Sequence, residues 1–282
     1  METVILAEPE WRARSLAHEA RVNALVGDHL SRRRAGRAHP VHDFLFTYYS
    51  FKPAQLRRWH PGVGVALAGS PPHASWSGYE SGADGVRVGR AVVERRAATV
   101  DWVRGLLAAT ASRPAHTGCF GLHEWAMVYR TSPGDVRHEA YPLRLGHAGT
   151  DEVVEAHQIR CSHFDAFRFF TDDARPRNAL TPTRELQPSL EQPGCLHAGM
   201  DLYKWAYKLT PLLPSELVVD AFELAAEIRE LDMRASPYDL SGLGYQPVRI
   251  ETTEGKREYV ERQRAFAERG AALRRRLLAA TA

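Results

Sequence analysis

The chain has 282 residues, of which 44% are hydrophobic and 25% charged, and its formal net charge is +3. This composition is typical of a globular protein and excludes a coiled coil, a collagen-like chain and a mainly disordered protein. No apolar run approaches the roughly 20 residues of a membrane-spanning helix, and no secretory signal is visible, so we expect a cytoplasmic protein without a membrane partner. The odd number of cysteines, three, predicts free thiols rather than a disulfide framework.

Hydrophobic spacing predicts helices along most of the chain. In chain order the predicted helices cover residues 9–35, 54–59, 90–111, 121–130, 150–157, 195–209, 215–233 and 255–280. Weak strands are predicted at 63–68, 86–88, 142–145 and 248–251, and 158–170 is predicted as a strand followed by a helix. The Gly-, Ser- and Pro-rich residues 69–89 and the proline-containing residues 172–194 are predicted loops. The expected fold is therefore mainly α (α+β), a compact helical domain with a small β-sheet, with residues 1–282 forming a single domain.

Three segments share one pattern of chemistry-bearing residues. They read CFGLHEWAMVYR (119–130), CSHFDAFRFF (161–170) and CLHAGMDLYKWAYK (195–208). Each has a cysteine, then a histidine two to four residues later, then an acid within four residues of that histidine, and then aromatic residues. Because all three cysteines of the chain fall in this arrangement, we expect the three segments to line one cavity.

One interpretation of these segments is a metal site. Cysteine and histidine are the usual zinc ligands, and residues four apart on a helix share a face. If a metal ion is bound, the candidate ligands are His163, His197 and Asp201. Neither Cys-x-x-Cys nor His-Glu-x-x-His occurs, so buried cysteines and helix-tethering histidines are the structural alternative.

A second interpretation needs no metal or other cofactor. A carboxylate beside aromatic rings can stabilise the oxocarbenium-like sugar formed when an N-glycosidic bond breaks, while the rings stack on the departing base. The favoured carboxylate is Glu124, and the other catalytic candidates are Asp165, Asp43, His42 and His123. The candidate substrate-binding residues are Trp125, Tyr129, Tyr48, Phe164, Lys204 and Trp205. The alternative for each acid is a surface or helix-capping role.

A third interpretation is a non-catalytic nucleic-acid-binding protein. Runs of three arginines at 32–34 and 274–276 could contact a nucleic-acid backbone, or they could be solvated helix ends. Neither Gly-x-Gly-x-x-Gly nor Gly-Lys-Ser/Thr occurs, which leaves a dinucleotide or nucleoside-triphosphate fold unsupported.

Five blocks of the sequence carry a family resemblance. They read HPVHDFLFTYYSFKPAQLRRWHPG, GCFGLHEWAMVYR, IRCSHFDAFRFFT, GCLHAGMDLYKWAYKL and LDMRASPYDL. Across about residues 10–270 the chain resembles an actinobacterial family commonly labelled 3-methyladenine DNA glycosylase. The resemblance implies a DNA-repair hydrolase, although neither a helix-hairpin-helix signature nor HEAT-like repeats are visible and no catalytic residue is carried over by motif.

The favoured function is therefore an N-glycosidase that releases an alkylated or modified purine base from DNA or a nucleoside. A metal-dependent hydrolase or oxygenase that uses the Cys/His/Asp/Glu clusters is the first alternative. The nucleic-acid-binding protein is the second.

Overall fold

The computed structural model describes residues 3–132, 134 and 140–281. Its described residues form eleven α-helices, three short 3-10 helices and one four-stranded sheet, so the prediction of a mainly α, α+β fold is confirmed. The chain divides into two compact units: unit 1 is Met1–Gly105, Leu202–Glu223 and Leu273–Ala282, and unit 2 is Leu106–Asp201 and Leu224–Ala272. The organisation of residues 1–282 as a single domain stays a prediction.

Four long helices contribute residues to both units. They are α4 (Arg90–Ala111), α9 (Leu196–Lys208), α10 (Ser215–Arg234) and α11 (Thr253–Ala280). The hydrophobic spacing predicted α4 with the same bounds and the other three to within two residues at each end. Within the described part of the chain, every helix is too short or too polar to cross a lipid bilayer.

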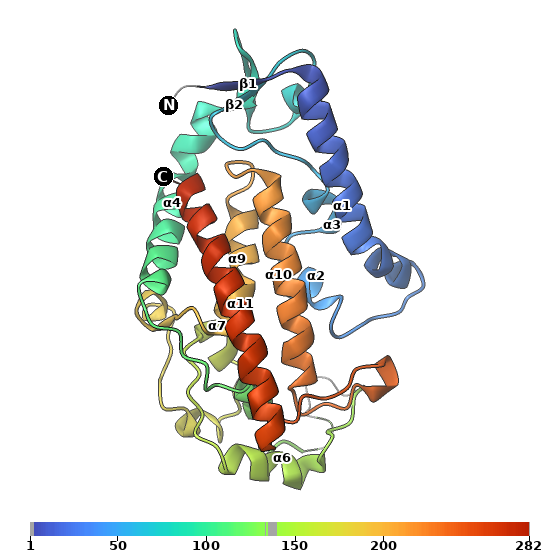
Figure 1. Ribbon diagram of the computed structural model, residues 1–282, viewed down its shortest axis with the longest axis vertical. Coiled ribbons are helices and arrows are strands. Elements are labelled where there is room, and N and C mark those ends of the chain that lie inside the picture. The colour runs from blue at the N-terminus through green and yellow to red at the C-terminus, as the bar shows by residue number, and fades with distance from the viewer. Residues whose placement is uncertain (1–2, 133, 135–139, 282) are drawn as a thin grey trace. The chain divides into compact units, whose positions relative to one another are not determined.

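The sheet belongs to unit 1 and has the strand order β1-β2-β4-β3. Its first two strands, β1 and β2, are labelled in Figure 1. Its strands are β1 (Val4–Leu6), β2 (Val65–Leu67), β3 (Tyr79–Gly82) and β4 (Gly85–Val88). β1 runs parallel to β2, whereas β3 and β4 form an antiparallel hairpin. The predicted strands at 63–68 and 86–88 are confirmed, but the predicted loop at 69–89 is wrong where it contains β3. β1 was not predicted, because three residues are too few to show a period.

Unit 1 also contains α1 (Glu8–Arg34), α2 (Phe44–Tyr48), α3 (Pro53–Leu56) and the 3-10 helix Pro72–Ser75. Glutamates in the first turn of α1 and arginines in its last turn complement the helix dipole. The buried face of α1 carries Trp11, whose indole donates a hydrogen bond to the backbone oxygen of Ala68 at 3.0 Å. Trp11 packs with Leu6, Trp59 and Leu67 into a hydrophobic cluster that joins the helix to the sheet.

Unit 2 contains α5 (Leu122–Ala126), α6 (Gly146–Glu155), α7 (Phe164–Phe167) and α8 (Gln187–Leu190), together with the 3-10 helices Arg175–Arg177 and Ser241–Leu243. The strands predicted at 142–145 and 248–251 are wrong. Leu143 makes only an isolated bridge with Tyr238, and the backbone nitrogen of Val248 donates to the carbonyl of Arg234. A period-2 pattern over four residues is too short to distinguish a strand from an extended loop.

Candidate metal centre

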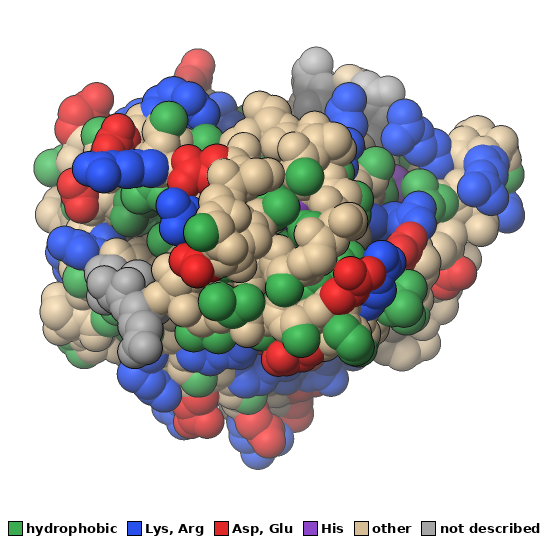
Figure 2. Space-filling model, turned by 90° about the horizontal axis from the view of Figure 1, so that it is seen from above, with side chains coloured by type: hydrophobic (Ala, Val, Ile, Leu, Met, Phe, Trp, Pro, Cys, Tyr) green, Lys and Arg blue, Asp and Glu red, His purple; other side chains and the backbone are tan. Residues whose placement is uncertain are grey.

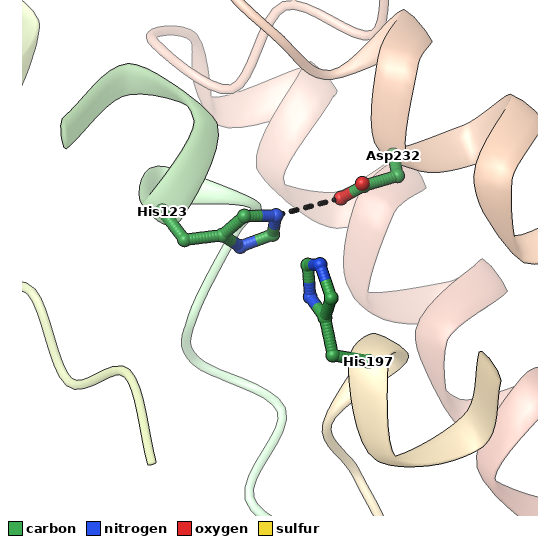
Figure 3. A group of neighbouring side chains, drawn as sticks. All are labelled: His123, His197 and Asp232. Atoms are coloured by element: carbon green, nitrogen blue, oxygen red, sulfur yellow. Dashed lines mark ion pairs between the residues drawn. The ribbon is translucent and has the colours of Figure 1, made fainter. Parts of the chain in front are cut away.

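Three side chains from three different helices of unit 2 lie close together in space: His123 from α5, His197 from α9 and Asp232 from α10 (Figure 3). One ligand atom of each lies within 4.8 Å of the others. The His123 Nε2 atom is 3.0 Å from Asp232 Oδ1, and the two imidazole rings are 4.4 Å apart and nearly perpendicular. Because metal–nitrogen and metal–oxygen bonds are about 2.0–2.2 Å long, these atoms are close enough to share one ion.

The turn before α5 fixes where His123 lies. Phe120 and Gly121 both have positive φ, 45° and 69°, so the chain makes two successive left-handed steps just before the helix. A Cβ atom at Gly121 would lie 3.4 Å from the ring of Tyr259 on α11. Glycine adopts this conformation freely, whereas at Phe120 it is strained, and such strain is concentrated at functional sites.

The contact between His123 and Asp232 is an ion-pair contact that lacks the geometry of a well-aligned hydrogen bond. The Nε2 and Oδ1 atoms are close, yet neither has a hydrogen-bond partner among the described residues. Both residues are less than a tenth exposed, and buried polar atoms normally have partners. A cation between the two side chains would satisfy both atoms at once.

Burial and charge set the protonation states of this group. Burial lowers the pKa of His123, but the charge and close contact of Asp232 together with the charge of Glu124 outweigh it, and the net pKa is raised. For His197, burial and the nearby His123 lower the pKa well below its usual value, which leaves a neutral imidazole. Burial would raise the pKa of Asp232, yet His123 and the other cations hold it below its usual range. A neutral imidazole and an ionised carboxylate are the forms that bind metal ions, so His197 and Asp232 are held ready for a metal, whereas His123 has to release its proton when a metal binds.

Arg229 holds the carboxylate of Asp232 from its other side. It is 1% exposed, and its Nη1 atom donates to Asp232 Oδ2 at 3.1 Å and to Glu124 Oε1 at 2.8 Å. The second carboxylate oxygen of Asp232 is thereby left facing His123. Carboxylate ligands of metals are commonly oriented by such a hydrogen bond.

A second histidine–carboxylate pair adjoins this group. His163 Nε2 is 3.3 Å from Asp201 Oδ2 and 4.0 Å from Glu191 Oε2, and its ring is 5.2 Å from that of His197. Neither ring nitrogen of His163 has a hydrogen-bond partner in the described part of the chain. Of the ligands predicted from sequence, His197 therefore lies in the three-residue group, whereas His163 and Asp201 lie beside it.

The three cysteines surround the same place. Cys119, Cys161 and Cys195 line a pocket of about 20 Å³ together with His123 and His197, which is room for one water molecule. The prediction that the three segments line one cavity is confirmed. All three are free thiols, and burial raises the pKa of each, that of Cys161 to about 12.

The aromatic wall predicted beside Glu124 is part of the core of unit 2. Trp125 is 0% exposed, and its indole donates to the backbone oxygen of Ala235 at 2.8 Å. Tyr129 is 1% exposed, and its hydroxyl donates to Glu155 Oε1 at 2.7 Å. Neither ring has a face open to a purine, and the Glu124 carboxylate is bound by Arg229.

Asp165 and Phe164, at the start of α7, also belong to unit 2. The Asp165 carboxylate is buried and lies 3.5 Å from Arg168 Nε and from Arg184 Nη2. The guanidinium of Arg184 also lies over the ring of Phe164, 4.9 Å from its centre. These contacts make Asp165 the acid of an ion-pair cluster.

Asp43 and His42 lie in unit 1. The Asp43 carboxylate accepts hydrogen bonds from Arg32 at 2.6 Å, from His29 at 2.8 Å and from the backbone nitrogen of His39 at 2.8 Å. Burial raises the pKa of Asp43, but Arg32 and His29 outweigh it and the pKa is lowered. The ring of His42 is 4.5 Å from that of His39. Three donors on one carboxylate indicate a structural role.

The other substrate-binding candidates in unit 1 are also packed. Tyr48 stacks on Phe44 at 5.0 Å. The Lys204 ammonium lies 4.6 Å from the ring centre of Trp205, which is 4% exposed and makes an edge contact with Trp102. These contacts show that Tyr48 and Trp205 pack against neighbouring side chains of unit 1.

Acids of unit 1 engage two of the six arginines in the two runs. Arg32 pairs with Asp43, Arg276 pairs with Asp220 at 2.7 Å, and Arg274 is only 1% exposed. On the face drawn in Figure 2, basic and acidic side chains are interspersed. Arg32, Arg274 and Arg276 are thus used within the protein, whereas Arg33, Arg34 and Arg275 are exposed.

Asp232 and Arg229 were not predicted from the sequence, although a signal was present. Ala221, Ala225, Ile228 and Asp232 follow the spacing of the buried face of α10, so Asp232 is an acid at an apolar position. Comparison of the chain with family models, curated proteins and solved structures finds no match. The family resemblance stays a prediction.

Proposed function

We propose that the protein is a metal-dependent hydrolase whose divalent cation is bound by His123, His197 and Asp232. The observation that carries the proposal is the contact between His123 Nε2 and Asp232 Oδ1, two buried atoms that lie 3.0 Å apart without a well-aligned hydrogen bond. Two histidines and one carboxylate form a common catalytic ligand set, which leaves positions open for water and substrate.

The chemistry of such a centre is activation of water. A catalytic zinc ion lowers the pKa of its bound water to about 7 and polarises the bond under attack. The pocket of about 20 Å³ beside His123 and His197 has room for that water. Soft thiol and imidazole side chains around the same pocket suit zinc, which favours hydrolysis over oxygen activation.

Elemental analysis of protein purified without added metal tests the proposal. We expect stoichiometric zinc in the wild type and loss of zinc in His197→Ala. His29→Ala, which removes a buried histidine of unit 1, is the matched control and should retain the metal. Hydrolysis of a panel of esters, amides and phosphoesters should stop with a chelator and resume with zinc. Absence of metal overturns the proposal, and iron with oxygen consumption would favour the oxygenase alternative.

The N-glycosidase hypothesis stays a separate prediction. Base release from methylated DNA or a modified nucleoside, insensitive to chelators and reduced about 10²–10⁴-fold in Glu124→Gln, would replace the proposed hydrolase. Salt-dependent DNA binding without base release or bound metal would favour the non-catalytic alternative.

A further inference from the structure

Unit 2 has a larger pocket that adjoins the proposed metal centre. Its volume is about 420 Å³, within the range of small-molecule sites. Arg160, Ser162 and Gln192 line both this outer pocket and the small pocket that contains His123 and His197. The two pockets therefore share part of one wall.

The backbone from Ile159 to Ser162 forms the shared wall. Asn178 fixes it, because its side chain accepts a hydrogen bond from the nitrogen of Cys161 at 2.7 Å and donates one to the oxygen of Cys161 at 2.9 Å. Side chains alternate along an extended segment. Accordingly, Ile159 and Cys161 line only the small pocket, whereas Arg160 and Ser162 line both.

Arg160 is the residue of this wall whose positive charge can bind a ligand. Its side chain is exposed, and it makes no ion pair with any residue that the structure describes. Arg113, which also lines the outer pocket, is occupied, because its guanidinium donates to the backbone oxygens of Ala109, Pro188 and Glu191.

The rest of the outer pocket suits an organic anion. Leu180 and Leu190 supply apolar surface, Ser162 and Ser189 supply hydroxyls, and the described lining contains no carboxylate. A guanidinium binds a carboxylate or a phosphate through two parallel hydrogen bonds. Both charge and shape therefore favour a ligand with one such group.

We propose that the outer pocket is the substrate site of the hydrolase and that it takes a small organic anion whose carboxylate or phosphate is bound by Arg160. The inference rests on the proposed function in one respect: the bond to be cleaved would face His123 and His197. Recognition of the anion itself depends only on Arg160 and the pocket.

Binding of three matched probes tests the inference. We expect benzoate or phenyl phosphate to bind the wild type, benzyl alcohol to bind at least about tenfold more weakly, and Arg160→Gln to weaken anion binding about 10–100-fold. Arg160→Lys, which retains the charge, should recover part of the loss. The control is Arg264→Gln, which alters an exposed arginine of unit 2 outside the pocket and should bind as the wild type does. The tighter of the two anions identifies the carboxylate or the phosphate as the group recognised.

Three outcomes overturn the inference: no binding of either anion at millimolar concentration, equal binding of benzyl alcohol, or unchanged binding in Arg160→Gln. Cobalt-substituted protein separates this failure from that of the proposed function. A change in the cobalt absorption bands when the anion binds places the anion beside the metal. If Arg160-dependent anion binding occurs in a protein that holds no metal, the anion site stands and the hydrolase does not.

Discussion

The buried histidines of the two units differ in how their ring nitrogens are used. In unit 1 each buried histidine uses at least one ring nitrogen: His18 bonds the carbonyl of Leu56, His73 bonds the carbonyl of Trp59, and His29 bonds the carboxylate of Asp43. The Nδ1 atom of His73 has no partner among the described residues, but its Nε2 atom does. In unit 2 both ring nitrogens of His163 and the Nε2 atom of His123 have no such partner among the described residues.

This difference separates a structural histidine from a candidate ligand. Burial is common to both sets, so burial alone has little diagnostic value. An unsatisfied buried polar group costs about 1–3 kcal/mol, and a protein retains that cost where a ligand removes it or where function requires it. The Nε2 atoms of His123 and His163 lie close to carboxylates, which is the arrangement that a cation would complete.

The largest effect is expected from Arg229→Met, because it leaves Glu124 and Asp232 buried without their shared cation. Removing one partner of a buried ion pair costs about 3–5 kcal/mol. The matched change in unit 1 is Arg21→Met, since Arg21 also pairs with two carboxylates but its side chain is 38% exposed. Solvent screens such pairs, and we expect its loss to cost at most about 1 kcal/mol. Urea unfolding measures both values, and equal losses would contradict the distinction between the two units.

Asp232→Asn is expected to lower zinc affinity at least about 100-fold, because it removes the charge of a ligand and changes of outer-shell groups alone cost about 10–100-fold. Asp43→Asn applies the same substitution to the carboxylate of unit 1 that already accepts three hydrogen bonds. It should leave zinc affinity unchanged while lowering stability. Competition with a chromophoric chelator gives both affinities, and zinc binding by Asp232→Asn with wild-type affinity would remove Asp232 from the ligand set.

Local sequence predicted the parts of the fold that local interactions determine. The α4 helix has the predicted bounds because its apolar residues repeat over 22 residues. β1 and β3 were missed because a strand of three or four residues depends on its pairing partner, and β1 pairs with residues about sixty positions away in β2. Residues 248–251 show the reverse error, since their apolar side chains are buried without a partner strand.

The sequence likewise predicted only part of the candidate site. The spacing of cysteine and histidine predicted that three segments meet, and they do. It could not select the ligands, because Asp232 and Arg229 lie on α10, outside all three segments. The sequence also could not predict that Glu124 forms an ion pair, since its partner Arg229 is 105 positions away in the chain.

A smaller effect is expected at Gly194, which precedes α9 and so helps to place His197. A Cβ atom there would lie 2.5 Å from the backbone oxygen of His116, and a backbone atom cannot rotate away. We expect Gly194→Ala to destabilise the protein by about 1–3 kcal/mol and to weaken zinc binding.

Gly105 on α4 provides the matched control. A Cβ atom there has nothing within 4 Å, so Gly105→Ala should stabilise the helix by about 0.5–1 kcal/mol without affecting the metal. Thermal unfolding shows the two signs, and a stabilised Gly194→Ala protein would contradict the close approach.

The smallest effect concerns the acid sensitivity of unit 1. Burial lowers the pKa of His60 from 6.5 to about 3, and His73, Arg58 and His18 add to the shift, while its Nδ1 atom contacts the hydroxyl of Tyr79. As the pH falls below 6.5, the imidazole of His60 is therefore protonated in the unfolded chain but stays neutral in the folded protein. The resulting stability is fully present above that pH and declines by about 1.4 kcal/mol per pH unit below it.

His60→Asn removes this titration and retains a side-chain amide near Tyr79, so we expect it to reduce the slope of stability against pH by about 1.4 kcal/mol per unit between about pH 6.5 and about pH 5. Most carboxylates stay ionised in this window, so they contribute little to the slope. Urea unfolding at several pH values measures it for both proteins. The variant is less stable at neutral pH if packing of the imidazole matters, but its slope should still be shallower. An unchanged slope would mean that His60 takes up a proton in the folded protein as it does in the unfolded chain. His60 would then not belong with the buried, hydrogen-bonded histidines of unit 1.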